Sequence, residues 1–376
     1  MTPGADGATG PGEPGPVAPG DRRLAHLDAL RGVAIVLVVL YHAYARYPEL
    51  IPFGARFADV PLISRGGIGV PLFFMISGFV ILMTLERCRG FADFILRRWL
   101  RLFPAMLACS LVIYATAGWF PERPLGTPVL RDVLPGLTFI EPLWWAYVLG
   151  PPQGVLEGAF WSLFVEVKFY VLFAGLYFLA GSRRAIVAIF GLFLLTRAFG
   201  LATKVPALAA VDFEALRRIA EQLSFDTLGW FAAGTLFYRY HEEGGRWRFG
   251  AALAAALIAA AAEGGLDTRD KLPGLFVVVL FASAAASVRV RALLANRFLL
   301  LLGFASYPVY LLHENMLVAM IVQVGRLAPE LPQVTMPVLP MLVVLGAGWF
   351  VARTLEPRVR AGMLPALRRL RARVAG

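Results

Sequence analysis

The chain has 376 residues, of which 59% are hydrophobic and 16% are charged, and its formal net charge is +11. Together with a mean hydropathy of +0.68, this composition excludes an ordinary soluble globular protein and predicts an integral membrane protein. The positive charge does not indicate a nucleic-acid partner, because most of the 36 Lys and Arg residues fall in alternate loops, on the side of the N-terminus.

Ten apolar stretches, each long enough or nearly long enough to cross a bilayer, follow one another along the chain. The seventh is the weakest, an alanine-rich stretch between Arg248 and Glu263. We therefore predict an all-α bundle of about ten transmembrane helices, at about residues 27–46, 68–85, 102–120, 159–180, 185–202, 223–240, 249–262, 273–288, 298–323 and 335–352.

These stretches define one membrane domain, residues 24–355, between two tails. Residues 1–23 are rich in glycine and proline and predict a disordered tail, and residues 356–376 are dense in arginine. Lys and Arg gather on the cytoplasmic side of membrane proteins. We therefore expect both tails to be cytoplasmic, in a multi-pass protein of the plasma membrane.

The first apolar stretch carries two ionisable groups, Arg31 and His42, in an otherwise aliphatic sequence. Eleven residue steps bring a helix about 20° past three full turns, so the two side chains lie on one face, roughly 16 Å apart along the axis. Ionisable groups are costly inside a membrane and usually serve a function there. We therefore expect Arg31 and His42 to line one crevice.

Three arginines, Arg97, Arg98 and Arg101, precede the third apolar stretch. Guanidinium groups at the start of a helix can bind phosphates in a bidentate manner, and the helix dipole adds to this attraction. The same residues also fit a simple anchor at the cytoplasmic surface. Their spacing does not decide between the two interpretations.

The fourth apolar stretch contains three polar residues at helical spacing. Ser162, Glu166 and Tyr170 are each four residues apart, so they share one face of a helix. The carboxylate can therefore point into the bundle. Lys168 lies on another face and is expected to point elsewhere.

Ionisable groups from three stretches reach a similar depth in the outer part of the membrane. They are His42, Glu166, and the neighbours His313 and Glu314 of the ninth stretch. One interpretation is structural, with a histidine held between helices by hydrogen bonds. The other is chemical, because a carboxylate beside an imidazole makes it a better general base.

Several common site motifs are missing from the sequence. It contains no phosphate-binding loop of nucleotide hydrolases, no nucleophile elbow and no paired-histidine zinc motif. The two cysteines, Cys88 and Cys109, are too few for a disulfide framework or a metal cluster. We therefore expect no metal. The glycines between residues 66 and 78 indicate close packing of helices.

Five segments, in order along residues 24–355, resemble motifs of the acyltransferase-3 family of integral membrane acyltransferases. They are LDALRGVAIVLVVLYH, GIGVPLFFMISGFVI, FILRRWLRLFP, WSLFVEVKFY and SYPVYLLHE. The chain departs from the family pattern at Pro71, where many relatives have an acidic residue, and at Asn315, where proline is frequent. Five motifs in order make the resemblance specific.

The resemblance implies a ten-helix bundle of the bacterial inner membrane that moves an acyl group, often acetyl, from cytoplasmic acyl-coenzyme A to a hydroxyl of a carbohydrate or similar acceptor. It implies His42 as the catalytic residue, as a base or as an acyl carrier, with Glu166 as its partner. It further implies binding groups for the donor and for the substrate, namely Arg31, Arg97, Arg98 and Arg101 for the donor and Ser162, Tyr170, Tyr310 and His313 for the substrate.

Two other classes of protein fit part of the sequence. Buried His and Glu at one depth also occur in proton-coupled transporters, although the internal repeats and paired broken helices of such carriers are not recognisable here. A polysaccharide-binding or export component without chemistry of its own would not need His42.

Overall fold

The structure is a computed structural model that describes residues 25–363 and 365, apart from 152–153, 209 and 264–267. The predicted disordered tail lies outside the described residues, as does most of the basic C-terminal tail. The described part is all-α, and no strand occurs in it.

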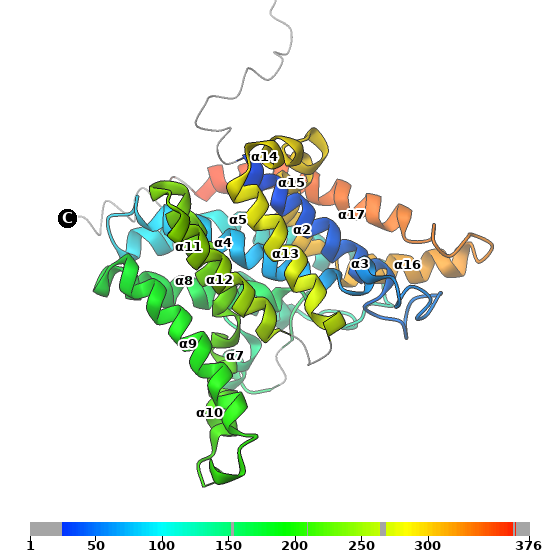
Figure 1. Ribbon diagram of the computed structural model, residues 1–376. Helices are drawn as coiled ribbons and strands as arrows, with labels where there is room; N and C mark the ends of the chain where they lie inside the picture. Colours follow the sequence, from blue (N-terminus) through cyan, green and yellow to red (C-terminus); the bar gives the residue numbers. More distant parts are fainter. Residues whose placement is uncertain (1–24, 152–153, 209, 264–267, 364, 366–376) are drawn as a thin grey trace, which may run out of the picture.

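The longer helices form one bundle (Figure 1). Each predicted transmembrane stretch coincides with a helix or a pair of helices, which confirms the all-α prediction. The helices are α2 (Ala25–Tyr44), α4 (Gly69–Leu85), α5 (Phe91–Thr116), α8 (Phe160–Ala180), α9 (Ser182–Ala202), α11 (Leu228–Glu243), α12 (Arg246–Ala262), α13 (Thr268–Ala286), α15 (Arg297–Leu312), α16 (Asn315–Leu327) and α17 (Val338–Phe350).

Six of the described helices are long and apolar enough to cross a membrane, and a seventh candidate combines α13 with α14 (Val288–Leu294), bent by 112°. The count of about ten is therefore approximate. Helices α11 and α12 have 16 and 17 residues, which is near the lower limit for a span. The weakest predicted stretch lies on α12.

The predicted ninth span is two helices rather than one. Helix α15 ends at Leu312 and α16 begins at Asn315. The two residues between them, His313 and Glu314, are buried, at 0% and 5% exposure. Hydropathy does not reveal this break, because the residues on both sides are apolar. The break places two ionisable side chains inside the bundle.

Glycines allow the central helices to pack at short distance. A Cβ atom on Gly78 of α4 would lie 2.1 Å from the carbonyl oxygen of Phe231 in α11, and one on Gly303 of α15 would lie 1.9 Å from that of Asp28 in α2. Any larger side chain would push these backbones apart. The predicted role of Gly78 in helix packing is confirmed.

The described residues of the segment between α5 and α8 include two short helices. They are α6 (Val133–Thr138) and α7 (Pro142–Leu149), and the indole of Trp145 donates to Thr138 Oγ1 at 3.0 Å. Lys168 of α8 turns toward this segment, where its ammonium contacts Glu141 Oε1 at 2.9 Å. Lys168 therefore points away from the polar face of α8, as its position on the helix predicts.

Candidate functional site

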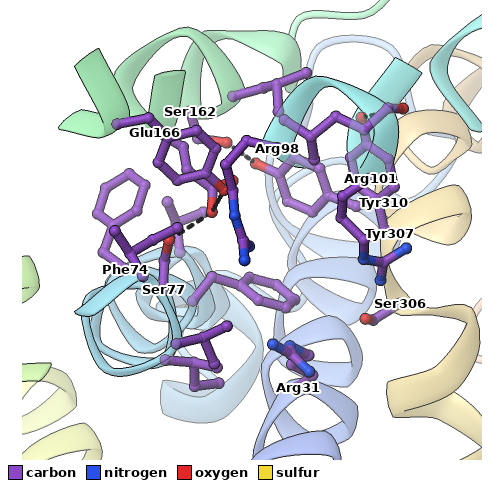
Figure 2. Close-up of a pocket in the computed structure, with 18 residues that line it drawn as sticks. Arg31, Phe74, Ser77, Arg98, Arg101, Ser162, Glu166, Ser306, Tyr307 and Tyr310 are labelled. Atoms are coloured by element: carbon purple, nitrogen blue, oxygen red, sulfur yellow. Dashed lines mark hydrogen bonds between the residues drawn. The ribbon is translucent and has the colours of Figure 1, made fainter. Parts of the chain in front are cut away.

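A pocket opens between α2, α4, α5, α8 and α15 (Figure 2). The walls combine apolar side chains such as Phe73 and Leu163 with a smaller number of polar groups. These polar groups are Arg31, Ser77, Arg98, Arg101, Ser162, Glu166, Tyr170, Ser306, Tyr307 and Tyr310.

The Glu166 carboxylate lies in this pocket and is held by two hydroxyl groups. Ser77 Oγ and Tyr170 OH each donate to Glu166 Oε1 at 2.6 Å. Tyr170 follows Glu166 by one turn of α8, as the sequence spacing predicts, and Ser77 comes from α4. The carboxylate is thereby fixed toward the pocket (Figure 2).

Two of the three clustered arginines line the pocket. The Arg98 guanidinium donates to Thr84 Oγ1 at 2.5 Å and lies 6.0 Å from the centre of the Tyr170 ring. Arg101 lies at the mouth, half-exposed, and contacts Glu356 Oε1 at 3.2 Å. Arg31, which bonds Asp28 at 2.5 Å, adds a third guanidinium from α2.

Arg97 does not line the pocket. Its guanidinium contacts Asp93 Oδ2 at 3.1 Å on the outer side of α5, where 49% of the side chain is exposed. The expectation that Arg97, Arg98 and Arg101 form one cluster is therefore wrong for Arg97. Arg97 shares a face of α5 with Arg101, so helix rotation alone does not separate them; the guanidinium of Arg97 is instead paired with Asp93, one turn earlier in α5.

One end of the pocket is closed by a hydrogen bond between two of its lining residues. Ser162 Oγ and Tyr310 OH are 2.7 Å apart, and the Phe73 ring packs edge-on against Tyr310 at 5.8 Å. Behind Tyr310 lies His313, whose Nδ1–H donates to the Tyr310 carbonyl oxygen at 2.7 Å. Tyr310 thus connects the pocket to a buried histidine.

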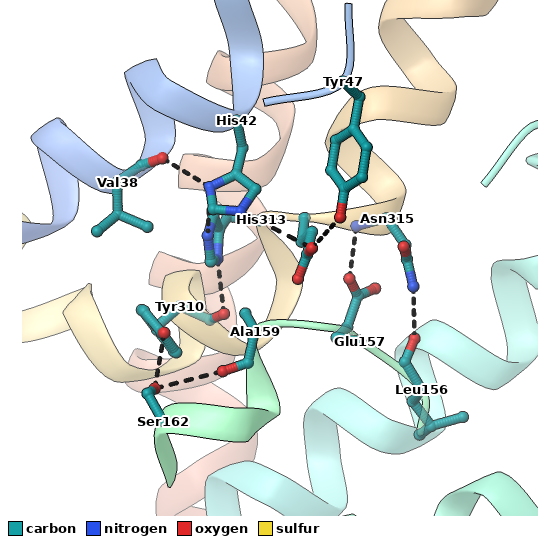
Figure 3. A network of polar contacts seen from close by, with 11 residues as sticks. Val38, His42, Tyr47, Leu156, Glu157, Ala159, Ser162, Tyr310, His313 and Asn315 are labelled. Atoms are coloured by element: carbon teal, nitrogen blue, oxygen red, sulfur yellow. Dashed lines mark hydrogen bonds and ion pairs between the residues drawn. The ribbon is translucent and has the colours of Figure 1, made fainter. Parts of the chain in front are cut away.

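His42 lies directly beyond His313 (Figure 3). Its Nδ1 is 2.9 Å from the Val38 carbonyl oxygen and 3.2 Å from His313 Nε2. A carbonyl oxygen can only accept, so Nδ1 of His42 carries the proton and Nε2 carries the free lone pair. This is the tautomer that a general base requires at Nε2.

The carboxylate beside His42 belongs to Glu314. Its Oε1 lies 3.8 Å from His42 Nε2, whereas the hydrogen bonds of Glu166 run to Ser77 and Tyr170. The expected pairing of Glu166 with His42 is therefore wrong. Glu166 and Glu314 were expected at a similar depth in the membrane, and depth does not determine which helix packs beside His42.

Arg31 and His42 do not share one open crevice. Arg31 lines the pocket, while His42 is not among its lining residues. The Ser162–Tyr310 hydrogen bond and the His313 ring lie between the pocket and His42. The prediction of a common face on α2 accounts for the position of Arg31 but not for the aromatic side chains that α4 and α15 insert.

Three residues of this site, Tyr47, Arg123 and Glu157, belong to none of the sequence motifs described above. The hydroxyl group of Tyr47 donates a hydrogen bond to Glu314 Oε1. Burial and the adjoining Glu314 carboxylate raise the pKa of the Tyr47 phenol above its ordinary value. Arg123 and Glu157, from the segment between α5 and α8, form a fully buried ion pair at 3.0 Å. The sequence offers one signal for Arg123 and Glu157, which is that each is an ionisable residue in or beside a proline-rich loop.

The described residues contain no group of three or more His, Cys, Asp or Glu side chains that could hold a metal ion. Cys88 and Cys109 are free thiols. The site instead combines guanidinium groups on one side with imidazole and carboxylate groups on the other. Such a set suits binding of an anionic ligand and transfer of a proton, which together are typical of a group-transfer site.

The model of the acyltransferase-3 family, described as an acyltransferase domain, matches residues 24–353. The chain therefore belongs to this family of membrane proteins.

Individual relatives agree with this assignment. An O-acetyl transferase of Shigella phage Sf6 is 39% identical over 94 residues, which are 24% of this chain and 26% of the relative. The protein called "Putative peptidoglycan O-acetyltransferase YrhL" of Bacillus subtilis is 28% identical over 197 residues, 47% of this chain and 28% of the relative. The O-acetyltransferase OatA of Staphylococcus aureus is 29% identical over 168 residues, 40% of this chain and 24% of the relative.

The chain spans about a quarter of the length of these curated relatives. No solved structure matches it.

Proposed function

We propose that the protein is a membrane O-acyltransferase that moves an acyl group, in particular acetyl, from acyl-coenzyme A to a hydroxyl of a carbohydrate acceptor. The observation that carries this proposal is the contact of His42 Nδ1 with the Val38 carbonyl oxygen at 2.9 Å, which assigns the proton to Nδ1 and leaves Nε2 free, 3.8 Å from the Glu314 carboxylate. Family membership supports the reaction class, and the names of three relatives support acetyl and oxygen as the group and the acceptor atom.

The pocket is the proposed binding site of the donor. Coenzyme A carries phosphate groups, and guanidinium groups bind phosphates through paired, charge-assisted hydrogen bonds. Arg31, Arg98 and Arg101 line this pocket together with apolar side chains. The arginines would hold the phosphates while the apolar walls contact the pantetheine arm.

His42 is the proposed general base. Nε2 takes the proton of the acceptor hydroxyl while the hydroxyl oxygen forms a bond to the carbonyl carbon of the thioester. The C–S bond then breaks, and the coenzyme A thiolate takes up the proton from the imidazolium. Glu314 would stabilise the positive charge of that imidazolium, because an anion 3.8 Å away favours the charged ring.

The thioester must pass the Ser162–Tyr310 hydrogen bond to reach His42. Both side chains line the pocket, and Tyr310 also accepts the hydrogen bond of His313. We therefore place the acceptor on the far side of this hydrogen bond, near His42 and Tyr47. Ser162, Tyr310 and His313 would contact the substrates, and Tyr170 would act through Glu166.

The acceptor and the orientation belong to the same proposal. The name of the YrhL relative specifies peptidoglycan, so a saccharide of the cell envelope is the proposed acceptor class. The excess of Lys and Arg on one side supports cytoplasmic termini and a cytoplasmic donor, in the bacterial inner membrane.

The experiment makes two measurements: coenzyme A binding by the purified protein, and acetylation of envelope saccharides by cells that produce it. His42→Ala should retain coenzyme A binding and lower acetylation by roughly 10²- to 10⁴-fold, the usual contribution of a general base. Full acetylation by this variant, at equal protein level, would contradict the proposal. Failure of the wild-type protein to bind coenzyme A would favour a proton-coupled carrier.

A further inference from the structure

The break between α15 and α16 leaves backbone groups that need partners. The first N–H groups of a helix have no acceptor within the helix, and a membrane interior supplies no water to replace it. Here the first residue of α16 is Asn315, which is only 1% exposed. Glu314, the residue before it, is in contact with His42.

Glu157, from the segment that precedes α8, caps this buried helix start. Its Oε2 accepts the backbone N–H of Asn315 at 2.5 Å. The carbonyl oxygen of Leu156 accepts a second hydrogen bond, from Asn315 Nδ2 at 2.9 Å. A carboxylate at a helix N-terminus also interacts favourably with the helix dipole. The break is therefore held by a segment remote in sequence (Figure 3).

Arg123 holds Glu157 in this position. Its Nη2 donates to Glu157 Oε1 at 3.0 Å and to the Leu156 carbonyl oxygen at 3.2 Å. Both charged side chains are 0% exposed. Charges so fully buried are retained only with good partners, and here Asn315 and Arg123 occupy the two oxygens of Glu157.

Gly158 completes the contact with Glu314. A Cβ atom at this position would lie 2.7 Å from Glu314 Oε1 and 2.8 Å from Oε2. The Glu314 carboxylate thus packs directly on the backbone next to Glu157. Its Oε2 is buried and has no hydrogen-bond partner among the described residues, so its position depends on packing and on Tyr47.

We propose that Glu157 and Arg123 are positioning residues, which hold the α15–α16 break so that Glu314 faces His42. This inference rests on the proposed function. Neither residue lines the pocket, so their effect should be on the rate of transfer and not on donor binding. A misplaced carboxylate of this kind typically costs roughly 100-fold in rate.

The test must separate positioning from folding. Removing one partner of a buried ion pair leaves an uncompensated charge, whereas removing both with apolar side chains of similar volume often preserves stability. We therefore choose the double variant Arg123→Met with Glu157→Met. The matched control is Lys168→Met with Glu141→Met, which removes the ion pair that joins α8 to the same segment.

The double variant should accumulate as folded protein and bind coenzyme A within about twofold of wild type, while kcat falls by roughly 10- to 100-fold. The Lys168/Glu141 control should keep both values. A wild-type kcat in the Arg123/Glu157 variant would overturn the inference, and so would an equal loss of coenzyme A affinity.

Gly158→Ala provides a second variant that leaves every charge in place. Its added methyl group would displace the Glu314 carboxylate, so kcat should again fall while coenzyme A binding stays. An unchanged kcat would overturn the inference. Failure of the proposed function is distinguishable, because wild-type protein and the His42→Ala variant would then acetylate equally.

Discussion

His42 Nε2 lies 3.8 Å from Oε1 of Glu314, so the first span meets the ninth at the point where the ninth is broken. The break makes this contact possible, because a continuous helix would carry Glu314 about 100° away from His313 around its axis. Because the helix is broken there, the consecutive residues His313 and Glu314 both contact His42. His313 contacts Nδ1 and Glu314 faces Nε2.

Glu314, and not Glu166, is the carboxylate beside His42, so substitutions of these two residues should change different kinetic parameters. Glu314→Gln should lower kcat by roughly 10- to 100-fold with little change in the KM for acyl-coenzyme A, because it removes charge stabilisation of the imidazolium. Glu166→Gln should mainly change that KM, because Glu166 lies in the donor pocket. Steady-state kinetics of the two purified variants will check this, and the reverse pattern would contradict the assignment.

The arginines are expected to differ in their effect on the donor. Arg98→Ala should raise the dissociation constant of coenzyme A by roughly 10- to 100-fold, since a hydrogen bond to a charged group contributes about 1.5–3 kcal/mol. Arg97→Ala is the matched control, and it should bind within about twofold of wild type, because Arg97 points out of the pocket. Calorimetric titration measures both, and a comparable loss in Arg97→Ala would restore it to the site.

Tyr47→Phe tests the second partner of Glu314. The pKa of the phenol is raised. The phenol therefore stays protonated, and keeps its hydrogen bond to Glu314, at least up to a pH equal to the ordinary tyrosine pKa of about 10. The ratio of wild-type to variant kcat should therefore be constant from about pH 7 to about pH 10. Its size should be about tenfold, for one hydrogen bond to a carboxylate. A ratio that falls to one at high pH would show that Tyr47 ionises.

Gly78→Ala tests the close packing of α4 on α11. Its methyl group would lie 2.1 Å from the Phe231 carbonyl oxygen, and overpacking of this kind costs about 1–3 kcal/mol. Gly175→Ala in α8 is the control, because nothing lies within 4 Å of its Cβ position. Thermal unfolding in detergent should show a lower Tm for the first variant only. Equal Tm values would mean that the helices can separate without cost.

Much of the donor pocket could be predicted from local spacing. Ser162, Glu166 and Tyr170 share one helix face and all line the pocket, because side-chain direction follows from the 3.6-residue period. Arg98 and Arg101 also line it, while Arg97 does not. Periodicity states which residues of one helix point together, but it does not state which direction faces the bundle.

The partners of His42 could not be predicted in the same way. Glu314 and Glu166 are carboxylates at similar depth, and only the packing of α2 against α15 decides which is near. The roles of Arg123 and Glu157 depend on a loop that folds back between helices. Such contacts join residues remote in sequence, so no local pattern specifies them.

By itself, the sequence determined the membrane class, the helical content and the approximate position of each span. The physical reason is that a bilayer requires long apolar segments with their backbone hydrogen bonds satisfied internally. The tertiary structure alone decided the break at His313 and Glu314, the carboxylate that faces His42, and the hydrogen bond that separates His42 from the pocket. These depend on which helix faces meet, and helix packing in a membrane is set by the fit of many side chains at once.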